Sequence, residues 1–330
     1  MNVAQPDHNT IHAALALAVR APSVHNSQPW QWRIGERSVQ LYADEDRRLP
    51  RIDPGRRDLL LSCGAALQHL TVALAALGWR SHVHRFPNAA EPNHLASVEF
   101  GAPAKASEQD IALAAAVPRR RTDRRWYSSW PVPAGDIALM AARAARAGVT
   151  LRRVQTPGPL SELVAEAVRV HAADPDYLTE LSMWSGRFGS LSGVPARSAP
   201  PPDGDAAIPA RLFANPSLHQ TQGVDAHEDA GVVVALATST DDELAHLRAG
   251  EATGVVLLTA TALGLSTCPV TEPLELESTR AAVRSVVLGD DGYPQMLLRV
   301  GWAPVNADPL PPSPRRPLED VVHRLDGSVF

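Results

Sequence analysis

Apolar residues recur along the chain at the two spacings that distinguish helices from strands. Helical spacing predicts helices over residues 10–20, 59–77, 107–117, 134–147, 159–172 and 242–264. Asn9 or Thr10 is the expected N-cap of the first helix, and Asp241 or Asp242 of the last. Alternating residues predict a hairpin of 30–34 and 38–43 and strands over 80–86, 95–100, 149–154 and 296–302. The continuous apolar run 231–238 is typical of a central strand.

Two of the predicted helices resemble each other. In Gly64 to Gly78 and in Gly250 to Gly264, a leading and a closing glycine stand 14 positions apart (78 − 64 and 264 − 250). Both segments are apolar, and each is followed by a predicted strand. Apolar helices that end on glycine are common, so the match has an unremarkable explanation as well. We interpret it as an indication of two related halves.

Residues 184–216 are rich in glycine, proline and serine. A segment of this length and composition fits a lid over a site better than an element of the core. A disordered insertion is the alternative that composition alone leaves open. The aromatic residues Trp184, Phe188 and Phe213 favour a lid that docks on the protein.

The composition is that of a folded globular chain, with 330 residues, 45% hydrophobic and 20% charged. The formal net charge is −5, which argues against general nucleic-acid binding because such proteins are usually basic. Lys105 is the only lysine among 31 basic residues. An anion site in this chain must therefore be built from arginine, whose planar guanidinium binds phosphate oxygens in pairs.

Several other sequence features narrow the class of protein. Cys63 and Cys268 lie far apart, which indicates neither a metal site nor a disulfide framework. Residues 1–10 lack the basic start and apolar core of a signal peptide. The apolar stretch 255–270 contains threonine, glycine and proline and is too short to span a membrane. We therefore expect a cytoplasmic protein without a metal or a membrane partner.

A dense arginine run occupies residues 119–125. In an extended segment, alternate residues share one face, so Arg120, Thr122 and Arg124 would point to the same place. Two guanidinium groups and a hydroxyl together form a phosphate clamp. A solvated basic patch is the usual fate of such a run and is the alternative when the run is considered alone.

A polar loop, residues 22–30, links the first helix to the hairpin. Ser23, Asn26 and Gln28 carry neutral donors and acceptors, which suit a planar heterocycle with carbonyls and ring nitrogens. A polar turn with an asparagine cap would explain a lone Ser-x-x-Asn. The longer string that ends in Gln28-Pro29-Trp30 is more specific.

This string resembles the P-S-x-x-N-x-Q-P-W signature of nitroreductase-type flavoproteins. More narrowly, the chain resembles the single-chain, duplicated Acg-type nitroreductases of actinobacteria. The resemblance covers nearly the full length and includes residues 64–78, 183–189 and 315–319.

The resemblance implies an α+β nitroreductase-like fold with a central mixed sheet flanked by helices. Two fused halves, residues 1–105 and 106–330, would form an internal pseudo-dimer, with the lid at about 184–216. Such a chain is expected to be a monomer, with a weak homodimer as the alternative.

The resemblance also implies an FMN site shared by the two halves. The first half would contribute Pro22, Ser23, Asn26 and Gln28. The second half would contribute the clamp Arg120, Thr122 and Arg124, the redox-edge residues Pro269, Val270, Thr271 and Glu272, and the basic pair Arg315 and Arg316. Neither a second clamp nor a second loop of this kind occurs in the sequence, so one flavin site is expected.

The function that follows from the resemblance is an FMN-dependent NAD(P)H oxidoreductase. It would reduce nitro, quinone or related small-molecule acceptors by a ping-pong mechanism, with the chemistry assigned to the flavin and no catalytic side chain. A non-enzymatic flavin-sequestering or regulatory protein with a closed lid is the alternative. Nucleic-acid binding through the arginine run is a third class, disfavoured by the net charge.

Overall fold

The computed structural model describes residues 5–187, 189–204 and 206–328. Phe188, one of the aromatic residues expected to dock the lid, lies outside these ranges. The helices are α1 (His8–Ala18), α2 (Arg57–Ala76), α3 (Glu108–Ala116), α4 (Ala134–Ala145), α5 (Pro157–Ala172), α6 (Pro175–Met183), α7 (Glu243–Ala262) and α8 (Glu277–Leu288).

The strands form two principal sheets. The first has the order β11-β1-β2-β4-β3 and consists of β1 (Trp30–Ile34), β2 (Ser38–Ala43), β3 (Trp79–Arg85), β4 (His94–Pro103) and β11 (Val322–Arg324). It is mixed, because β11 runs parallel to β1 and the other pairs are antiparallel. The second, antiparallel sheet has the order β5-β8-β10-β9, with β5 (Thr150–Arg153), β8 (Val232–Thr238), β9 (Ser266–Pro269) and β10 (Tyr293–Gly301). The short strands β6 (Ser185–Arg187) and β7 (Val194–Pro195) pair separately.

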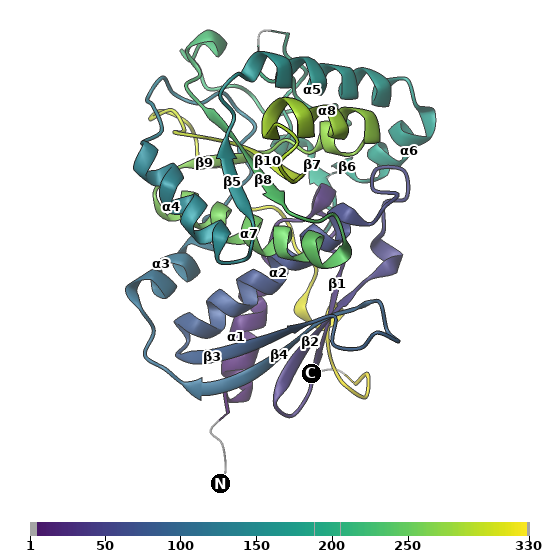
Figure 1. Ribbon diagram of the computed structural model, residues 1–330, viewed down its shortest axis with the longest axis vertical. Coiled ribbons are helices and arrows are strands. Elements are labelled where there is room, and N and C mark those ends of the chain that lie inside the picture. Colours follow the sequence, from purple (N-terminus) through teal and green to yellow (C-terminus); the bar gives the residue numbers. More distant parts are fainter. Residues whose placement is uncertain (1–4, 188, 205, 329–330) are drawn as a thin grey trace.

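The two echoed helices, α2 and α7, pack against each other between the sheets (Figure 1). They approach most closely at their glycines. A Cβ atom on Gly64 would lie 2.1 Å from the carbonyl oxygen of Leu247, and one on Gly250 would lie 2.1 Å from that of Leu61. Only glycine permits this approach of backbone to backbone. The sequence echo therefore corresponds to a reciprocal helix–helix contact at the centre of the molecule.

The burial of each sheet explains its sequence pattern. Helices α4 and α7 cover one face of the second sheet, and α5 and α8 cover the other. All seven residues of β8 are consequently buried, which accounts for its continuous apolar run. Helices α1 and α2 cover one face of the first sheet, and the edge strand β3 alternates between half-buried and exposed residues.

The α+β class, the mixed sheet and the hairpin are confirmed. The predicted N-cap of α1 is wrong, because the side chain of Asp7, rather than of Asn9 or Thr10, accepts the backbone N–H of Thr10 at 2.7 Å. Asp242 caps α7 and accepts the N–H of Ala245 at 2.8 Å, as one of the two predictions had it.

Helix α2 is also long and apolar enough to cross a membrane by length and composition. Of its most apolar 18-residue window, 78% is buried inside the protein, as in the core helix of a soluble fold. The segment that passes this test is thus α2 and not the stretch 255–270 singled out from the sequence.

Candidate functional site

Two adjoining cavities lie where the halves of the chain meet. The larger has a volume of about 170 Å³ and the smaller about 70 Å³. Both are lined by Pro22, Ser23 and His25 of the loop after α1 and by Thr122 and Arg124 of the arginine run. The structure therefore brings together the two segments that the sequence predicted to form one site.

An unusual backbone shapes the loop after α1. His25, Asn26 and Gln28 all have positive φ angles, between 45° and 55°, which is uncommon for residues other than glycine. The hydroxyl of Ser23 accepts the N–H of Gln28 at 2.9 Å, and that of Ser62 on α2 accepts the N–H of Val24 at 3.0 Å. Such local strain persists where the surroundings fix it and is concentrated at functional sites.

Asn26 and Gln28 direct their amides to the lid region and the C-terminal tail. Asn26 donates to the carbonyl of Gly193 at 3.1 Å and accepts from the guanidinium of Arg315 at 2.8 Å. Gln28 donates to the carbonyl of Leu191 at 2.8 Å and lines neither cavity. The loop thus holds residues 191–193 and the C-terminal tail beside the cavities. Gln28 contributes to this from outside the cavity lining.

Arg120 and Arg315 form a buried positive cluster beside the smaller cavity. Arg120 is only 6% exposed, and the Nε atoms of both residues are buried without a hydrogen-bond partner. Burial, reinforced by neighbouring arginines, lowers the pKa of Arg120 to about 10 and that of Arg315 to about 9. Within the described part of the chain, neither has an acidic partner. Both remain charged at neutral pH, so the cluster suits an anion.

The arginine run lies beside β9, because Thr122 forms a parallel bridge with Thr267. Arg124 donates to the carbonyl of Ser198 at 2.8 Å and lies 4.9 Å above the ring of Phe213, both in the lid region. The expected alternation holds for Arg120, Thr122 and Arg124. It fails for Arg121, which also lines the smaller cavity instead of facing elsewhere.

The four redox-edge residues predicted after β9 line the larger cavity: Pro269, Val270, Thr271 and Glu272. Glu272 is buried, and a carboxylate oxygen of this residue lies 3.1 Å from Nδ1 of His171. The hydroxyl of Thr271 accepts a hydrogen bond from Arg211 at 3.1 Å. This edge of the cavity is therefore part of a wider charged network.

The centre of that network, Arg211, was missed from the sequence. Its guanidinium contacts His25 and forms an ion pair with Glu275. Burial and the neighbouring Arg211 hold the pKa of His25 well below its usual range, so that imidazole is neutral. Burial also raises the pKa of Glu275. A lone arginine in a proline-rich segment forms no motif, so no sequence signal could have found it.

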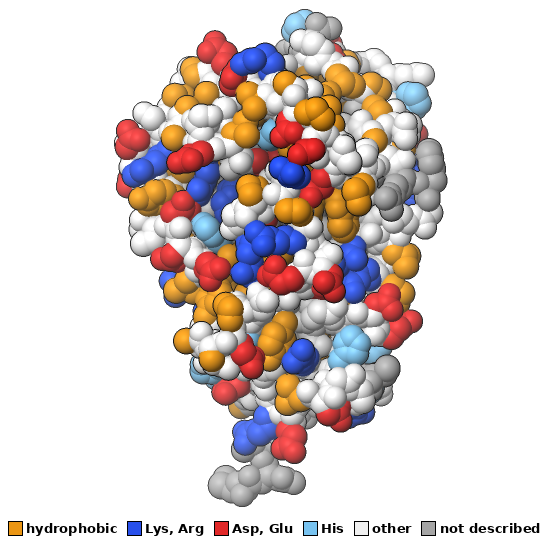
Figure 2. Space-filling view, turned by 90° about the vertical axis from the view of Figure 1, so that its right-hand side faces the viewer, with side chains coloured by type: hydrophobic (Ala, Val, Ile, Leu, Met, Phe, Trp, Pro, Cys, Tyr) orange, Lys and Arg blue, Asp and Glu red, His pale blue; other side chains and the backbone are white. Residues whose placement is uncertain are grey.

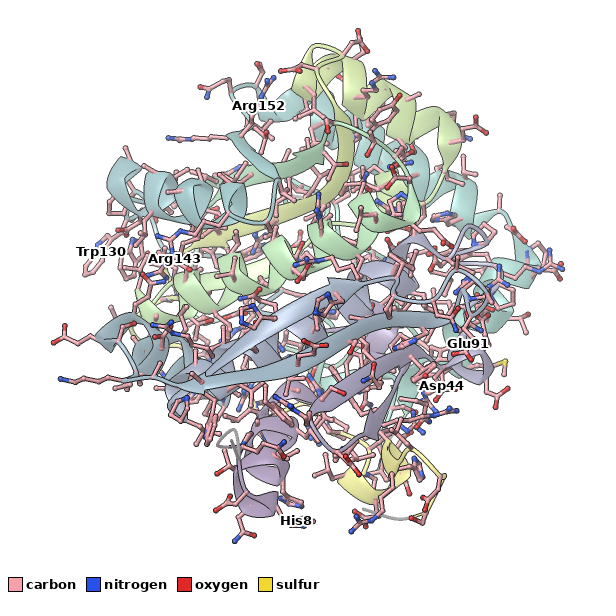
Figure 3. All side chains as sticks on the ribbon, turned by 60° about the horizontal axis from the view of Figure 1, so that its bottom comes forward. His8, Asp44, Glu91, Trp130, Arg143 and Arg152 are labelled. Atoms are coloured by element: carbon pink, nitrogen blue, oxygen red, sulfur yellow. The ribbon has the colours of Figure 1, made fainter. Side chains whose placement is uncertain are left out.

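Arg316 does not reach the cavities, contrary to its predicted role on a phosphate. Its guanidinium pairs with Asp44, labelled in Figure 3, at 3.0 Å. Its backbone N–H donates to the side chain of Gln28 at 2.8 Å. The residue fastens the tail to the hairpin, because the partly buried carboxylate of Asp44 attracts its charge away from the cavities.

The outer surface offers no comparable concentration of charge on the face drawn in Figure 2. Basic and acidic side chains are interspersed over it. The buried cluster of Arg120 and Arg315 therefore differs from this surface in having no carboxylate to balance it.

No family model matches the chain. Two Mycobacterium tuberculosis proteins are similar to it over nearly their full lengths. "Putative NAD(P)H nitroreductase Rv3131" is 58% identical over 322 residues, covering 98% of this chain and 93% of the relative. "Putative NAD(P)H nitroreductase acg" is 36% identical over 323 residues, covering 96% of each.

One solved structure supports the fold. The crystal structure of a "putative nitroreductase" from Anabaena variabilis matches with a TM-score of 0.51 and 12% identity, covering 91% of this chain and 90% of that one. Fold, site geometry and full-length relatives agree, and the chain belongs to the nitroreductase family.

Proposed function

We propose that the protein is an FMN-dependent NAD(P)H oxidoreductase that reduces nitro, quinone or related small-molecule acceptors. The observation that carries the proposal is the buried pair Arg120 and Arg315, which lie at the smaller of two joined cavities and have no acidic partner among the described residues. A phosphate group would balance these charges, and a ring could extend from it into the larger cavity. The names of the M. tuberculosis relatives support the nicotinamide reductant.

The residues present fit such a cofactor. Arg120 and Arg124 would hold the phosphate, with Thr122 beside it, and Pro22, Ser23 and Asn26 would bound the ribityl chain. Arg315 would add its positive charge beside the phosphate, since its terminal nitrogens already donate to Asn26 and to the carbonyls of Arg20, Ala21 and Pro314. Residues 269–272 would lie at the ring. Bound FMN would supply the hydride chemistry, in a ping-pong order that separates reductant from acceptor. The side chains orient and exclude water, and none is assigned as an acid or base.

The proposal includes an architecture. The reciprocal contact of Gly64 and Gly250 supports two related halves, divided near residue 105, that form an internal pseudo-dimer with one flavin site. A chain that contains both halves of the site needs no second subunit, so we propose a cytoplasmic monomer.

Visible spectroscopy tests the function. The purified protein is mixed with FMN, freed of excess cofactor, and then treated with NADPH or NADH in the absence of oxygen. We expect a retained flavin spectrum that bleaches on addition of one of these reductants and recovers with a nitro compound or a quinone. Failure to retain flavin at all would refute the proposal.

A second candidate function is flavin sequestration without turnover. The larger cavity, at about 170 Å³, is smaller than the roughly 300 Å³ at which ligand pockets usually begin. The lid region covers it through Ile208, Ala210 and Arg211. A flavin that is retained but not reduced by either nicotinamide would favour this candidate.

A further inference from the structure

One arginine of the lid segment reaches deep into the wall of the larger cavity. We define the lid segment as residues 189–204 and 206–216. Its backbone lies over the cavity, and the side chain of Arg211 is only 10% exposed. A buried guanidinium on a covering segment requires partners that compensate its desolvation.

Those partners come from three separate parts of the chain: the loop after α1, helix α6 and the segment 271–275. Nη1 of Arg211 donates to Nε2 of His25 at 2.7 Å and to the hydroxyl of Tyr177 at 3.1 Å. Nη2 donates to the hydroxyl of Thr271 at 3.1 Å and to the carboxylate of Glu275. Nε lies 3.7 Å from a carboxylate oxygen of one further residue, Glu272.

Arg211 could either bind a ligand in the cavity or hold the lid segment against the cavity wall, and its hydrogen bonds distinguish these two roles. Both terminal nitrogens already use their two hydrogens, and the remaining nitrogen faces a carboxylate. Neither terminal nitrogen has a hydrogen left for a substrate or a cofactor, so a two-pronged contact with either one is disfavoured. The Nε–H lies too far from Glu272, at 3.7 Å, to form a hydrogen bond. The arrangement instead fastens the lid segment to the cavity wall.

We call the residues that contact Arg211 its socket: His25, Tyr177, Thr271, Glu272 and Glu275. The two carboxylates of this socket make withdrawal of the Arg211 side chain unfavourable. The side chains of Glu275 and Glu272 are 2% and 4% exposed. Removing the guanidinium would leave two buried carboxylates, Glu272 beside the imidazole of His171 and Glu275 beside the hydroxyls of Thr271 and Tyr177. Uncompensated buried charge is among the costliest states in a folded protein, so the closed lid is strongly favoured.

The proposed cofactor residues take part in the same closure. Arg124 donates to the carbonyl of Ser198, and Asn26 donates to that of Gly193. Both carbonyls belong to the lid segment. The space left beneath it is about 170 Å³, below the roughly 300 Å³ at which ligand pockets usually begin.

We propose that Arg211 is the latch of the lid segment and that its release from the socket of His25, Tyr177, Thr271, Glu272 and Glu275 admits the electron acceptor and permits cofactor exchange. The inference rests on the proposed function for the identity of those molecules. The latch itself is a property of the protein chain and can be measured without them. Arg211 is a positioning residue, because it acts through the lid.

Hydrogen–deuterium exchange of the full-length protein without added ligand tests the latch. In the closed lid, the N–H of Ala214 donates to Ser185 Oγ and that of Ser217 to the carbonyl of Ala196, each at 3.0 Å. The substitution Arg211→Lys keeps the charge but cannot span the socket. We expect the amides of Ala214 and Ser217 to exchange at least ~10-fold faster, equivalent to ~1.4 kcal/mol in the opening equilibrium.

A second variant and a control make the result specific. Glu275→Gln weakens the latch from the socket side and should accelerate the same lid amides. Arg197→Lys changes an exposed arginine of the lid segment and should leave the exchange rates of the Ala214 and Ser217 amides unchanged. Unchanged lid amides in both test variants would overturn the proposal. So would equal acceleration in β8, since Arg211 would then be a general structural residue.

Cofactor release provides the second readout. FMN dissociation, followed by its fluorescence after dilution, should be about tenfold faster in Arg211→Lys than in wild type or Arg197→Lys. Equal release rates would overturn the gating of cofactor exchange. If wild type retains no FMN while the lid amides respond as expected, the proposed function fails and the latch remains.

Discussion

At the scale of single residues, the site is defined by charge that the protein leaves unbalanced. Arg120→Met removes a buried guanidinium with no acidic partner and replaces it with an apolar side chain of similar length. We expect FMN affinity to fall by about 10- to 100-fold, since a charge-assisted contact is worth about 1.5–3 kcal/mol. The thermal midpoint without FMN should stay the same or rise, because a desolvated charge is lost. Calorimetry and FMN titration measure the two effects.

The matched control is Arg316→Met. This guanidinium lines neither cavity and pairs with Asp44. Its loss should lower stability by about 1–3 kcal/mol and leave FMN affinity nearly unchanged. Weaker FMN binding in Arg316→Met than in Arg120→Met would contradict the assignment of the anion site.

A second residue-scale prediction concerns Asp53. Burial and the neighbouring Asp58 raise the pKa of this carboxyl to about 7. Because the folded state then holds a proton that the unfolded state has released, stability falls as pH rises from about 4 to 7. Asp53→Asn keeps an oxygen to accept the N–H of Leu59 and removes the titration. The free energy of unfolding of the variant, measured with urea, should rise by about 1–2 kcal/mol relative to that of wild type between pH 5 and 7.5. A stability difference between the variant and wild type that does not depend on pH would rule out the titration of Asp53 as its cause.

The sequence predicted the site only where its residues form a continuous pattern. The loop carrying Ser23 and the alternation of Arg120 and Arg124 are local features, and the structure brings both to the cavities. The partner of each charge is not a local feature. Arg316 and Arg211 could be assigned only once Asp44 and the socket glutamates were placed by the fold.

At the scale of elements, the contact of α2 and α7 depends on two glycines. Gly64→Ala would place a methyl group 2.1 Å from the carbonyl oxygen of Leu247. The next nearest atoms, of Gly250 and Glu251, also belong to the backbone of α7 and cannot turn aside. The helices must separate, which should cost about 2–3 kcal/mol or more. Gly135→Ala in α4 meets nothing within 4 Å and should be neutral or stabilising by about 0.5–1 kcal/mol. Urea unfolding of both variants checks this, and equal stabilities would contradict the role of the close approach.

The elements that the sequence failed to predict are those stabilised mainly by tertiary contacts. Helix α8 is amphipathic, and only three of its residues, Thr279, Val283 and Leu288, are buried. Strand β11 has three residues and pairs at the edge of its sheet. Strand β9, by contrast, is the strand expected after Gly264. Helix α2, strand β8 and the hairpin repeat one pattern over their whole length, which is why periodicity located them.

At the scale of the whole molecule, the chain crosses between its halves. The tail follows the second sheet, yet β11 pairs with β1 and Arg315 reaches Asn26 of the first half. The loop, the arginine run and the tail thus lie together within one chain, as the proposed site requires. In a two-chain arrangement, each of these segments would have to be supplied by a partner.

This crossing predicts the stoichiometry. We expect one FMN per chain, since the arginine run occurs once and the tail delivers Arg315 to it. We also expect the loaded protein to sediment as a monomer, because both sides of the cavities come from the same chain. Absorbance ratios after desalting and analytical ultracentrifugation measure the two quantities. Two FMN molecules per chain would mean that the second half carries its own site, and FMN retained only in a dimer would mean that a partner completes it. Arg315→Met, which disconnects the tail from the cavity, should reduce retention without changing the oligomeric state.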